Sequence, residues 1–368
     1  MIRVLIVDDV QTIRLALRAV LETDPELMVV GEAGSGEDAV TLCRRLRPDI
    51  VTMDIEMPGM GGYEAIRQIM NQAPCPVVVI TAIESESLME VSFKALALGA
   101  VTVLPKPRVL LPDDAEAKNL IHQIKIMAAV KVVRRSLRTE SASVVLDKGG
   151  GPPAVPAKEA PSFRLRHAAR LVAIGLSTGG PPALQTVLKG LPSSFSLPIV
   201  AVQHISRTFV FGLTSWLSNT THFRCKVAEH GETLRPGSVY LSPDHRHLTV
   251  KGGGQLWLDA SEPVDGHRPS ATVLFESVAR NFGAKAIGIL MTGMGQDGAR
   301  GLKAMRQAGA YTIAQDEASS VIFSMPKAAI ELNAAEEILD LNQIAPRLRS
   351  LTENVPEQKE APRDGRKE

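Results

Sequence analysis

Short apolar runs alternate with amphipathic segments along the first 130 residues of the chain. The apolar runs are "RVLIVDD", "MVVGEA", "DIVTMD", "PVVVITA" and "VTVLPKP", and segments such as "QTIRLALRAVLET" lie between them. Brief apolar runs are typical of strands buried on both faces, and apolar residues spaced by three and four positions are typical of helices. Five successive strand and helix pairs predict a doubly wound parallel sheet.

The same alternation resumes near residue 170 and continues to about residue 348. Its strands are "RLVAIGLS", "LPIVAVQHIS", "AIGILM" and "YTIAQD". The stretch between the two blocks includes "KGGGPPAVPAKEAP", which has little to bury and is typical of a linker. We therefore expect two α/β domains with doubly wound parallel sheets, at residues 1–130 and 167–348. A linker at 131–166 would join them, and a disordered tail would occupy 349–368.

Composition narrows the class of protein. The chain has 368 residues, more than one domain usually needs, and a formal net charge of +1. Such a balance favours neither nucleic acid nor acidic lipid. Three cysteines without metal spacing fit a reducing compartment, and no apolar run is long enough for a membrane span or a signal peptide. We expect a cytoplasmic monomer with no nucleic-acid partner and no membrane insertion.

Acidic residues follow two strands of the first block. Asp8 and Asp9 come after "VLIV", Asp54 comes after "DIVTM", Thr81 ends "PVVVIT", and Lys106 follows "VTVLP". The carboxyl ends of parallel strands meet at one edge of the sheet, so these groups should converge. Clustered carboxylates suit Mg2+, which prefers oxygen ligands and bridges to phosphate. Asp54 would then be the phosphoryl acceptor, with Thr81 and Lys106 contacting the phosphoryl oxygens.

Any one of these acids alone is more often a helix cap or a solvated turn. The whole set is more specific, because "VDD", "MDIEMPGMGG", "VITA" and "LPKP" in this order resemble the receiver domain of two-component response regulators. The resemblance implies a flavodoxin-like fold, phosphorylation of Asp54 by a histidine kinase, and Mg2+ bound by the acids. The aromatic residue common in that family is absent, because Thr102 and Val103 occupy the corresponding segment.

The second block begins with "LVAIGLSTGGPPALQTVLKGL", which predicts a strand, a glycine turn and a helix. Ser177 lies in the turn, and "GLSTG" matches the G-x-S-x-G pattern of an exposed nucleophilic serine. Alone the pattern is weak, because a serine that caps a helix is more frequent.

Two other strand ends strengthen the prediction. His204 ends "LPIVAVQHIS", and Asp297 lies in the glycine turn after "AIGILM". A serine needs a base, and the base needs a carboxylate to fix its tautomer, so the three residues could form a catalytic triad. The turn Gly293-Met294-Gly295 would offer backbone N–H groups as an oxyanion hole.

Rival interpretations exist for this block. An ordinary α/β-hydrolase runs serine, acid, histidine along the chain, which would require Asp244 with His267. "GMGQDG" also satisfies G-x-G-x-x-G, with Asp316 near the spacing of a ribose-binding acid, which favours a dinucleotide site. A carboxylate at Asp297 would repel the pyrophosphate of such a ligand, so we prefer the esterase. A partner-binding output domain fused to a receiver is the non-enzymatic alternative.

The remaining histidines are weighed by their surroundings. His267 precedes a predicted helix and is a candidate to line the site, with Arg268 beside it to meet an anionic substrate. The others lie in polar or looped sequence without a partner acid at a strand end, so we expect them at the surface: His122, His167, His222, His230, His245 and His247.

The segments "GLSTGGPPAL", "VAVQHIS", "GSVYLSPDHRHL", "HRPSATVLFES", "LMTGMGQDGARGL" and "SVIFSMPKAAI" resemble the catalytic domain of the chemotaxis receptor methylesterases. The resemblance implies a Rossmann-like fold that hydrolyses glutamyl methyl esters of chemoreceptors without a cofactor and also deamidates receptor glutamines. It places the triad on Ser177, His204 and Asp297, and it places substrate positioning and oxyanion stabilisation on Thr178 and Met294.

One segment departs from the pattern of that family. Thr272, after Ala271, stands where the family usually has an aspartate, which could change local packing or receptor preference. The pairing of a receiver with this domain also leads to a hypothesis of regulation. The unphosphorylated receiver would cover the cleft at Ser177, and phosphorylation of Asp54 would weaken that contact.

Overall fold

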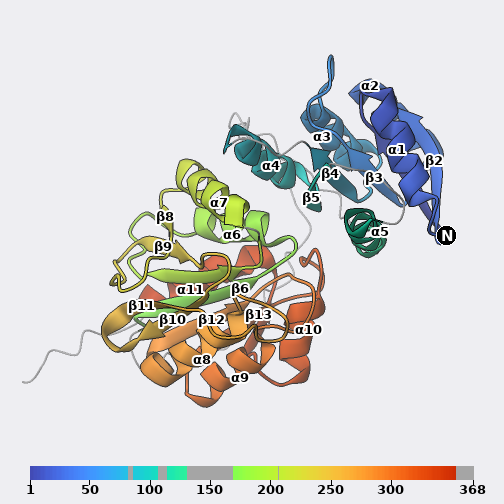
Figure 1. Cartoon of the computed structure of the whole chain (residues 1–368). Helices are drawn as coiled ribbons and strands as arrows, with labels where there is room; N and C mark the ends of the chain where they lie inside the picture. Colours follow the sequence, from blue (N-terminus) through green and yellow to red (C-terminus); the bar gives the residue numbers. More distant parts are fainter. Residues whose placement is uncertain (82–85, 107–113, 131–168, 206, 354–368) are drawn as a thin grey trace, which may run out of the picture.

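A computed structural model describes residues 1–81, 86–106, 114–130, 169–205 and 207–353. Within these ranges the chain forms two α/β domains, each built on a parallel sheet, as Figure 1 shows. The predicted fold class is therefore confirmed. The expected linker at 131–166 and His167 lie outside the described residues.

The N-terminal domain has five strands in the order β2-β1-β3-β4-β5, the flavodoxin-like order. Its strands are β1 (Ile2–Val7), β2 (Leu27–Ala33), β3 (Ile50–Met53), β4 (Val77–Thr81) and β5 (Thr102–Pro105). Its helices are α1 (Gln11–Leu21), α2 (Gly36–Leu46), α3 (Gly62–Gln72), α4 (Glu86–Leu98) and α5 (Ala115–Ala128). The residues of β3 and β4 are all buried, because helices cover both faces of the sheet.

The C-terminal domain has a seven-stranded parallel sheet in the order β14-β13-β12-β6-β7-β9-β8. Its strands are β6 (Leu171–Leu176), β7 (Ile199–Gln203), β8 (Arg224–Val227), β9 (Ser238–Leu241), β12 (Ala286–Leu290), β13 (Tyr311–Gln315) and β14 (Glu337–Leu339). Its helices are α6 (Gly180–Gly190), α7 (Arg207–Thr220), α8 (Ala271–Phe282), α9 (Ala299–Gln307), α10 (Ser324–Glu331) and α11 (Leu341–Glu353). The chain leaves β6 in one direction and returns to its other side with β12, so the strand order reverses there.

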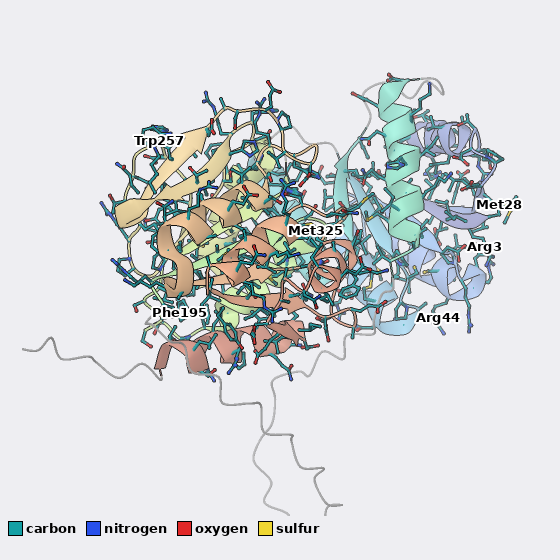
Figure 2. The ribbon with its side chains drawn as sticks, turned by 90° about the horizontal axis from the view of Figure 1, so that it is seen from below. Arg3, Met28, Arg44, Phe195, Trp257 and Met325 are labelled. Atoms are coloured by element: carbon teal, nitrogen blue, oxygen red, sulfur yellow. The ribbon has the colours of Figure 1, made fainter. Side chains whose placement is uncertain are left out.

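Two features of this domain differ from the sequence expectation. A hairpin of β10 (His247–Lys251) and β11 (Gln255–Asp259) is antiparallel and stands apart from the main sheet, with Trp257 at the outer edge of the molecule (Figure 2). The start of the expected tail is also corrected, because α11 continues to Glu353. The reason is burial: Leu348 and Leu351 lie on one face of α11 and pack into the core.

The domains contact each other through α4, which packs against α7 and α6 (Figure 1). Phe93 of α4 is fully buried and stacks on Trp216 of α7 with 5.4 Å between ring centroids. Its ring also meets Phe209 edge-on at 6.2 Å. Because α6 follows Ser177 and α7 follows His204, the receiver-like domain packs on the helices that adjoin the candidate active site. Among the described residues, no helix has the length and apolarity of a membrane span.

Candidate active site and phosphorylation site

The sheet register brings Ser177 and His204 together. Leu176 of β6 pairs with Gln203 of β7, so Ser177 and His204 are the next residues on two neighbouring strands, and such strands lie about 4.8 Å apart. The His204 N–H donates to the Leu176 carbonyl at 3.1 Å. On the other side of β6, the Ser177 N–H donates to the carbonyl of Thr292, which follows β12, at 3.0 Å. The predicted residues therefore meet at the point where the strand order reverses.

Asp297 contacts His204 directly. Its Oδ2 lies 2.9 Å from Nε2 of His204, and its carboxylate is fully buried. Oδ2 also accepts the Ala271 N–H at 2.6 Å, while Oδ1 accepts the Ser270 hydroxyl at 2.7 Å and the Thr272 N–H at 3.0 Å. These donors come from the first turn of α8, where helix N–H groups are free to bind an anion.

The surroundings of Asp297 fix its charge. Burial alone would raise the pKa of its carboxyl, but hydrogen bonds from His204 and Ser270 and the charge of His204 hold that pKa well below its usual value. An ionised carboxylate only accepts hydrogen bonds, so His204 presents Nε2–H to it. This tautomer leaves Nδ1 as the basic nitrogen of the ring.

Nδ1 of His204 is buried and has no hydrogen-bond partner among the described residues. The structure thus contains the contact between His204 and Asp297, and it places Ser177 beside His204 without a hydrogen bond to the ring. Buried nitrogens are rarely left unpaired, and contacts between a nucleophile and its base are often loose in the absence of substrate. This nitrogen is therefore suited to receive a proton from Ser177.

Gln203 was not predicted, yet its side chain joins the backbone at Ser177 to the backbone at His204. Its Nε2 donates to the carbonyl of Ser177 at 2.8 Å and to the carbonyl of His204 at 3.1 Å. The signal in the sequence is a polar residue at the end of the apolar run "IVAV". The structure shows that this residue is buried.

The glycine turn after β12 offers fewer donors than expected. The Gly293 N–H donates to the Ile322 carbonyl at 2.9 Å, so it is not free for an oxyanion. The Met294 N–H bonds to no other described residue. Gly293 is needed for close packing, because a Cβ there would lie 2.7 Å from Cβ of Ser177 and 2.2 Å from Sδ of Met325, which is buried inside the domain (Figure 2).

Thr178 and the turn at Ser177 are held in place by contacts with Thr292 and Val321. The carbonyl of Thr178 accepts the Thr292 hydroxyl at 2.9 Å. Gly179 adopts a φ of +78°, which a side chain would disfavour, and a Cβ there would also meet Val321. The local sequence "STGG" is therefore what allows the chain to turn sharply from β6 into α6.

The other histidines divide into three groups. His267 lies half-buried at the site, where its ring stacks on that of His204 with centroids 4.1 Å apart; burial and then the charge of His204 lower its pKa. The expectation for His247 was wrong, because that ring is fully buried between backbone groups. Those found exposed, as expected, are His122, His222, His230 and His245.

The structure opposes the expected role of Arg268 and the dinucleotide interpretation. Arg268 donates from Nη1 to the carbonyls of Ala260 and Ser261, so this nitrogen supports a loop instead of meeting an anionic substrate. Asp316 accepts the N–H and hydroxyl of Ser319 within its own turn. With Asp297 bound to His204, the G-x-G-x-x-G turn is occupied by a buried carboxylate, which disfavours a dinucleotide site.

Thr272, the departure from the family pattern, still supplies a buried acceptor. Its hydroxyl accepts the Gly298 N–H at 2.8 Å, and its own N–H binds Asp297. The substitution of an aspartate by threonine therefore leaves the turn around Asp297 connected to α8.

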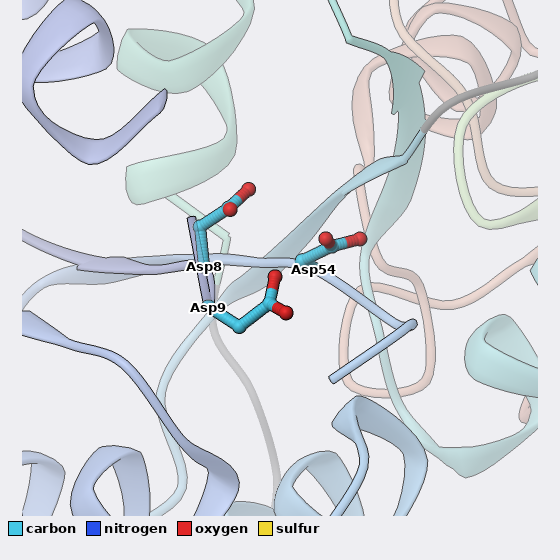
Figure 3. Close-up of side chains that lie close together, drawn as sticks. All are labelled: Asp8, Asp9 and Asp54. Atoms are coloured by element: carbon cyan, nitrogen blue, oxygen red, sulfur yellow. The ribbon is translucent and has the colours of Figure 1, made fainter. Parts of the chain in front are cut away.

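The N-terminal domain gathers its acids as predicted. Figure 3 shows the side chains of Asp8, Asp9 and Asp54 close together. These residues follow β1 and β3, and one carboxylate oxygen of each lies within 4.8 Å of those of the other two. Lys106 lies beside them, with Nζ 2.6 Å from Oδ2 of Asp54 and 2.8 Å from Oδ2 of Asp8. One ammonium group among three carboxylates leaves a net negative charge, and all the potential metal ligands are carboxylate oxygens. This donor set fits Mg2+.

Charge and burial have different effects on the pKa values of Asp54 and Lys106, which form an ion pair. Burial raises the pKa of Asp54, and the contact with Lys106 only partly offsets it. Burial would lower the pKa of Lys106, but its hydrogen bonds to Asp54 and Asp8 raise that pKa overall. Lys106 has two anionic partners, whereas Asp54 shares its single cation with Asp8, whose charge further raises the pKa of Asp54.

Thr81 and Lys106, the predicted contacts of the phosphoryl oxygens, are joined through the backbone. Thr81 is buried at the end of β4, and its carbonyl accepts the Lys106 N–H at 2.8 Å. Val103, where the family commonly carries an aromatic residue nearby, is half-buried and packs against the core. This position therefore offers no ring whose rotation could report phosphorylation.

Comparisons with known proteins agree with this arrangement. The family model for the CheB methylesterase matches residues 172–348, and that for the response regulator receiver domain matches residues 4–111. A protein of Syntrophus aciditrophicus, named protein-glutamate methylesterase/protein-glutamine glutaminase 1, is 42% identical over 347 residues, which cover 94% of this chain and 97% of that protein. The chain belongs to the CheB methylesterase family.

A second relative matches this chain over nearly its whole length, and a solved structure matches its C-terminal half. Protein-glutamate methylesterase/protein-glutamine glutaminase 4 of Myxococcus xanthus is 44% identical over 355 residues, covering 95% of this chain and 96% of that protein. The crystal structure of the Thermotoga maritima CheB methylesterase catalytic domain is 36% identical and covers 50% of this chain and all of that domain, with a TM-score of 0.49. Both resemblances stated from the sequence, to receivers and to receptor methylesterases, are confirmed.

Proposed function

We propose that this protein is a phosphorylation-regulated serine hydrolase that removes methyl esters from glutamate residues of chemoreceptors. The observation that carries the proposal is the buried contact of Asp297 with His204 beside Ser177, in a chain of the CheB family. The names of its relatives also support deamidation of receptor glutamines. The protein would act in the cytoplasm in chemotactic adaptation, with a histidine kinase as phosphodonor.

The proposed reaction begins at Ser177. Its Oγ attacks the ester carbonyl while Nδ1 of His204 accepts the hydroxyl proton, and Asp297 stabilises the resulting imidazolium. The carbonyl oxygen becomes an anion in the tetrahedral intermediate, and the Met294 N–H is the donor available to bind it. When the intermediate collapses, the C–O bond to the methoxy group breaks and His204 returns the proton, so methanol leaves.

Water then resolves the acyl-enzyme by the reverse sequence. His204 removes a proton from the water, the hydroxide attacks the acyl carbon, and Ser177 leaves with the proton that His204 returns. The product on the receptor is a glutamate carboxylate. Deamidation of a glutamine follows the same steps with ammonia as the leaving group, so one site serves both activities.

The receiver domain would control this chemistry through Asp54. Its carboxylate oxygen is the acceptor for a phosphoryl group, and Asp8, Asp9 and Asp54 would hold Mg2+, which supplies charge neutralisation when it is bound. Lys106 lies within reach of oxygens on Asp54 and can pair with the attached phosphoryl group. Thr81 is the proposed hydroxyl donor to that group.

Regulation is proposed to use the domain contact. The aromatic cluster of Phe93, Phe209 and Trp216 holds α4 on the helix that follows His204. Val321 and Ile322 of the C-terminal domain also pack against the apolar core of the receiver, and the Ile322 carbonyl binds Gly293 beside Ser177. Phosphorylation that loosens this interface would free the site for receptor helices.

A methanol-release assay on methylated receptor tests the function. Ser177→Ala should reduce turnover by about 10^3-fold or more, because only binding and oxyanion effects would remain. Ser194→Ala, at an exposed serine of the same domain, is the matched control and should keep the wild-type rate. Equal methanol release from wild type and Ser177→Ala would refute the proposal. Phosphorylation of the protein without methanol release from any form would instead favour the partner-binding alternative.

A further inference from the structure

Asp297 is connected to a second buried polar residue besides His204. Ser270 is fully buried, and its Oγ donates to Oδ1 of Asp297 at 2.7 Å. The same hydroxyl accepts the Val273 N–H at 3.4 Å, because Ser270 is the N-cap of α8. One side chain thus ties the start of α8 to the acid of the proposed triad.

His247 in turn fixes Ser270. Its ring is fully buried, and Nδ1 accepts the backbone N–H of Ser270 at 3.2 Å. Nε2 lies 3.0 Å from the carbonyl of Glu262, which can only accept, so the ring carries its proton on Nε2. Both ring nitrogens therefore bond to backbone groups, and the ring is held in one orientation and one tautomer.

These contacts form a continuous chain from the hairpin to His204. It runs from His247 of β10 through Ser270 at the start of α8 to Asp297 after β12, and then to His204 after β7. Apart from His204, its members are fully buried. Each oxygen of Asp297 accepts two hydrogen bonds, so the carboxylate cannot rotate without breaking one of them.

We propose that Ser270 and His247 are positioning residues for the hydrolytic reaction, holding Asp297 in the orientation that aligns His204 with Ser177. The proposal rests on the proposed serine chemistry. Without the Ser270 hydroxyl, Oδ1 of Asp297 keeps one donor, and the carboxylate can turn away from Nε2 of His204. Misplacement of a catalytic group by about 1 Å can cost about 10^2 in rate, so we expect kcat to fall about 10- to 100-fold. KM should stay within about twofold, because neither residue contacts the proposed position of the substrate.

The test compares Ser270→Ala with Ser277→Ala. Ser277 lies on the same helix and is also buried. Its hydroxyl accepts the Val250 N–H at 3.0 Å and donates to the Leu274 carbonyl at 2.7 Å. It therefore matches Ser270 in burial and in the number of hydrogen bonds, but its partners do not include Asp297. Two readouts are taken on the full chain: kcat and KM for methanol release, and the rate at which phenylmethylsulfonyl fluoride modifies Ser177. Ser270→Ala should lower kcat and the modification rate together, while Ser277→Ala should lower only Tm.

A second pair of variants distinguishes the loss of positioning from a loss of folding. In His247→Asn the side-chain oxygen can replace Nδ1 as the acceptor for Ser270, whereas in His247→Leu no acceptor remains. We expect the asparagine variant to retain at least about tenfold more kcat than the leucine variant at temperatures where both are folded. Equal kcat in these two variants, or equal kcat in Ser270→Ala and Ser277→Ala, would overturn the positioning role.

The two readouts separate this proposal from the function on which it rests. If the sulfonyl fluoride modifies wild-type Ser177 and Ser270→Ala slows it, the positioning role stands even where methylated receptor yields no methanol, and only the substrate is wrong. If wild-type Ser177 is no more reactive than an exposed serine, the serine chemistry and the positioning role both fail.

Discussion

The two domains each place a buried aspartate just beyond a parallel strand, Asp54 after β3 and Asp297 after β12. Both are at most 5% exposed, yet burial and hydrogen bonding leave the pKa of Asp54 raised and that of Asp297 lowered. Asp297 accepts four hydrogen bonds. Asp54 accepts one backbone N–H, from Ile55, and shares Lys106 with Asp8.

This difference suits the two carboxylates to opposite tasks. Both carboxylate oxygens of Asp297 are occupied by hydrogen bonds, so this group can orient an imidazole but is not available as a nucleophile. Asp54 accepts fewer hydrogen bonds from the described residues, from the Ile55 N–H and from Lys106, so its oxygens keep acceptor positions for another partner. We therefore propose that the same side chain, at the same kind of strand end, acts as an orienting group in one domain and as a nucleophile in the other, according to its hydrogen-bond donors.

The largest effect is expected from Asp297→Asn. The amide cannot keep His204 in the tautomer with a proton on Nε2 and would place N–H against the α8 donors, so kcat should fall about 10^3- to 10^4-fold. Methanol release measures this loss. Asp316→Asn is the control, because Asp316 also follows a strand but its carboxylate accepts from Ser319 in its own turn, and the variant should retain at least about half of the wild-type rate. A rate for Asp297→Asn close to that of Asp316→Asn would contradict the orienting role.

An intermediate effect is expected from the domain contact. Phe93→Ala removes the ring that stacks on Trp216 and should weaken the hold of α4 on α7. If that contact restrains the site, basal methanol release should rise at least about fivefold, within the usual range of allosteric coupling. Deletion of residues 1–130 should raise it at least as much.

Phe195→Ala controls for general loss of packing in this second experiment. Phe195 meets Phe223 inside the C-terminal domain, away from α4, so its removal should lower Tm without raising the basal rate. A basal rate that is unchanged or lower in both Phe93→Ala and the deletion would show that the receiver does not restrain the enzyme.

The smallest effect concerns the charge of Asp54. A carboxyl whose pKa is raised by folding contributes stability that is fully present below its unfolded pKa and is lost as pH rises through the folded pKa. Asp54→Asn removes this penalty, so at pH 7 and without Mg2+ the variant should melt at a slightly higher temperature than wild type. The difference should vanish below about pH 4, near the unfolded pKa of aspartate. Asp9→Asn, at an exposed acid, should show a smaller shift. A lower Tm for Asp54→Asn at pH 7 would contradict the raised pKa.

Much of the site could be predicted because it lies at strand ends. Apolar runs locate strands, and in a parallel sheet their carboxyl ends meet, which is enough to bring Ser177, His204 and Asp297 to one edge. The same rule gathers Asp8 and Asp54. Local sequence also specifies the turn at Gly179, whose positive φ requires glycine.

The remainder depends on contacts between distant segments. His247 follows the polar run Asp244-His245-Arg246, and the packing of the hairpin on α8 buries it. Likewise the Gly293 N–H is engaged by Ile322, and Cys43 and Cys75 bring their sulfur atoms within 3.3 Å although they are distant in sequence. Periodicity reports which face of an element is apolar, but it does not report which polar groups meet across the fold.

We propose that the two strand-end aspartates do different chemistry, Asp297 as orienting group and Asp54 as phosphoryl acceptor. Methanol release from methylated receptor, measured with and without acetyl phosphate and Mg2+, tests it most directly in wild type, Asp54→Asn and Asp297→Asn. We expect Asp54→Asn to keep the basal rate but to gain nothing from the phosphodonor, and we expect Asp297→Asn to be nearly inactive under both conditions. Stimulation of Asp54→Asn equal to that of wild type, or a wild-type rate in Asp297→Asn, would contradict it.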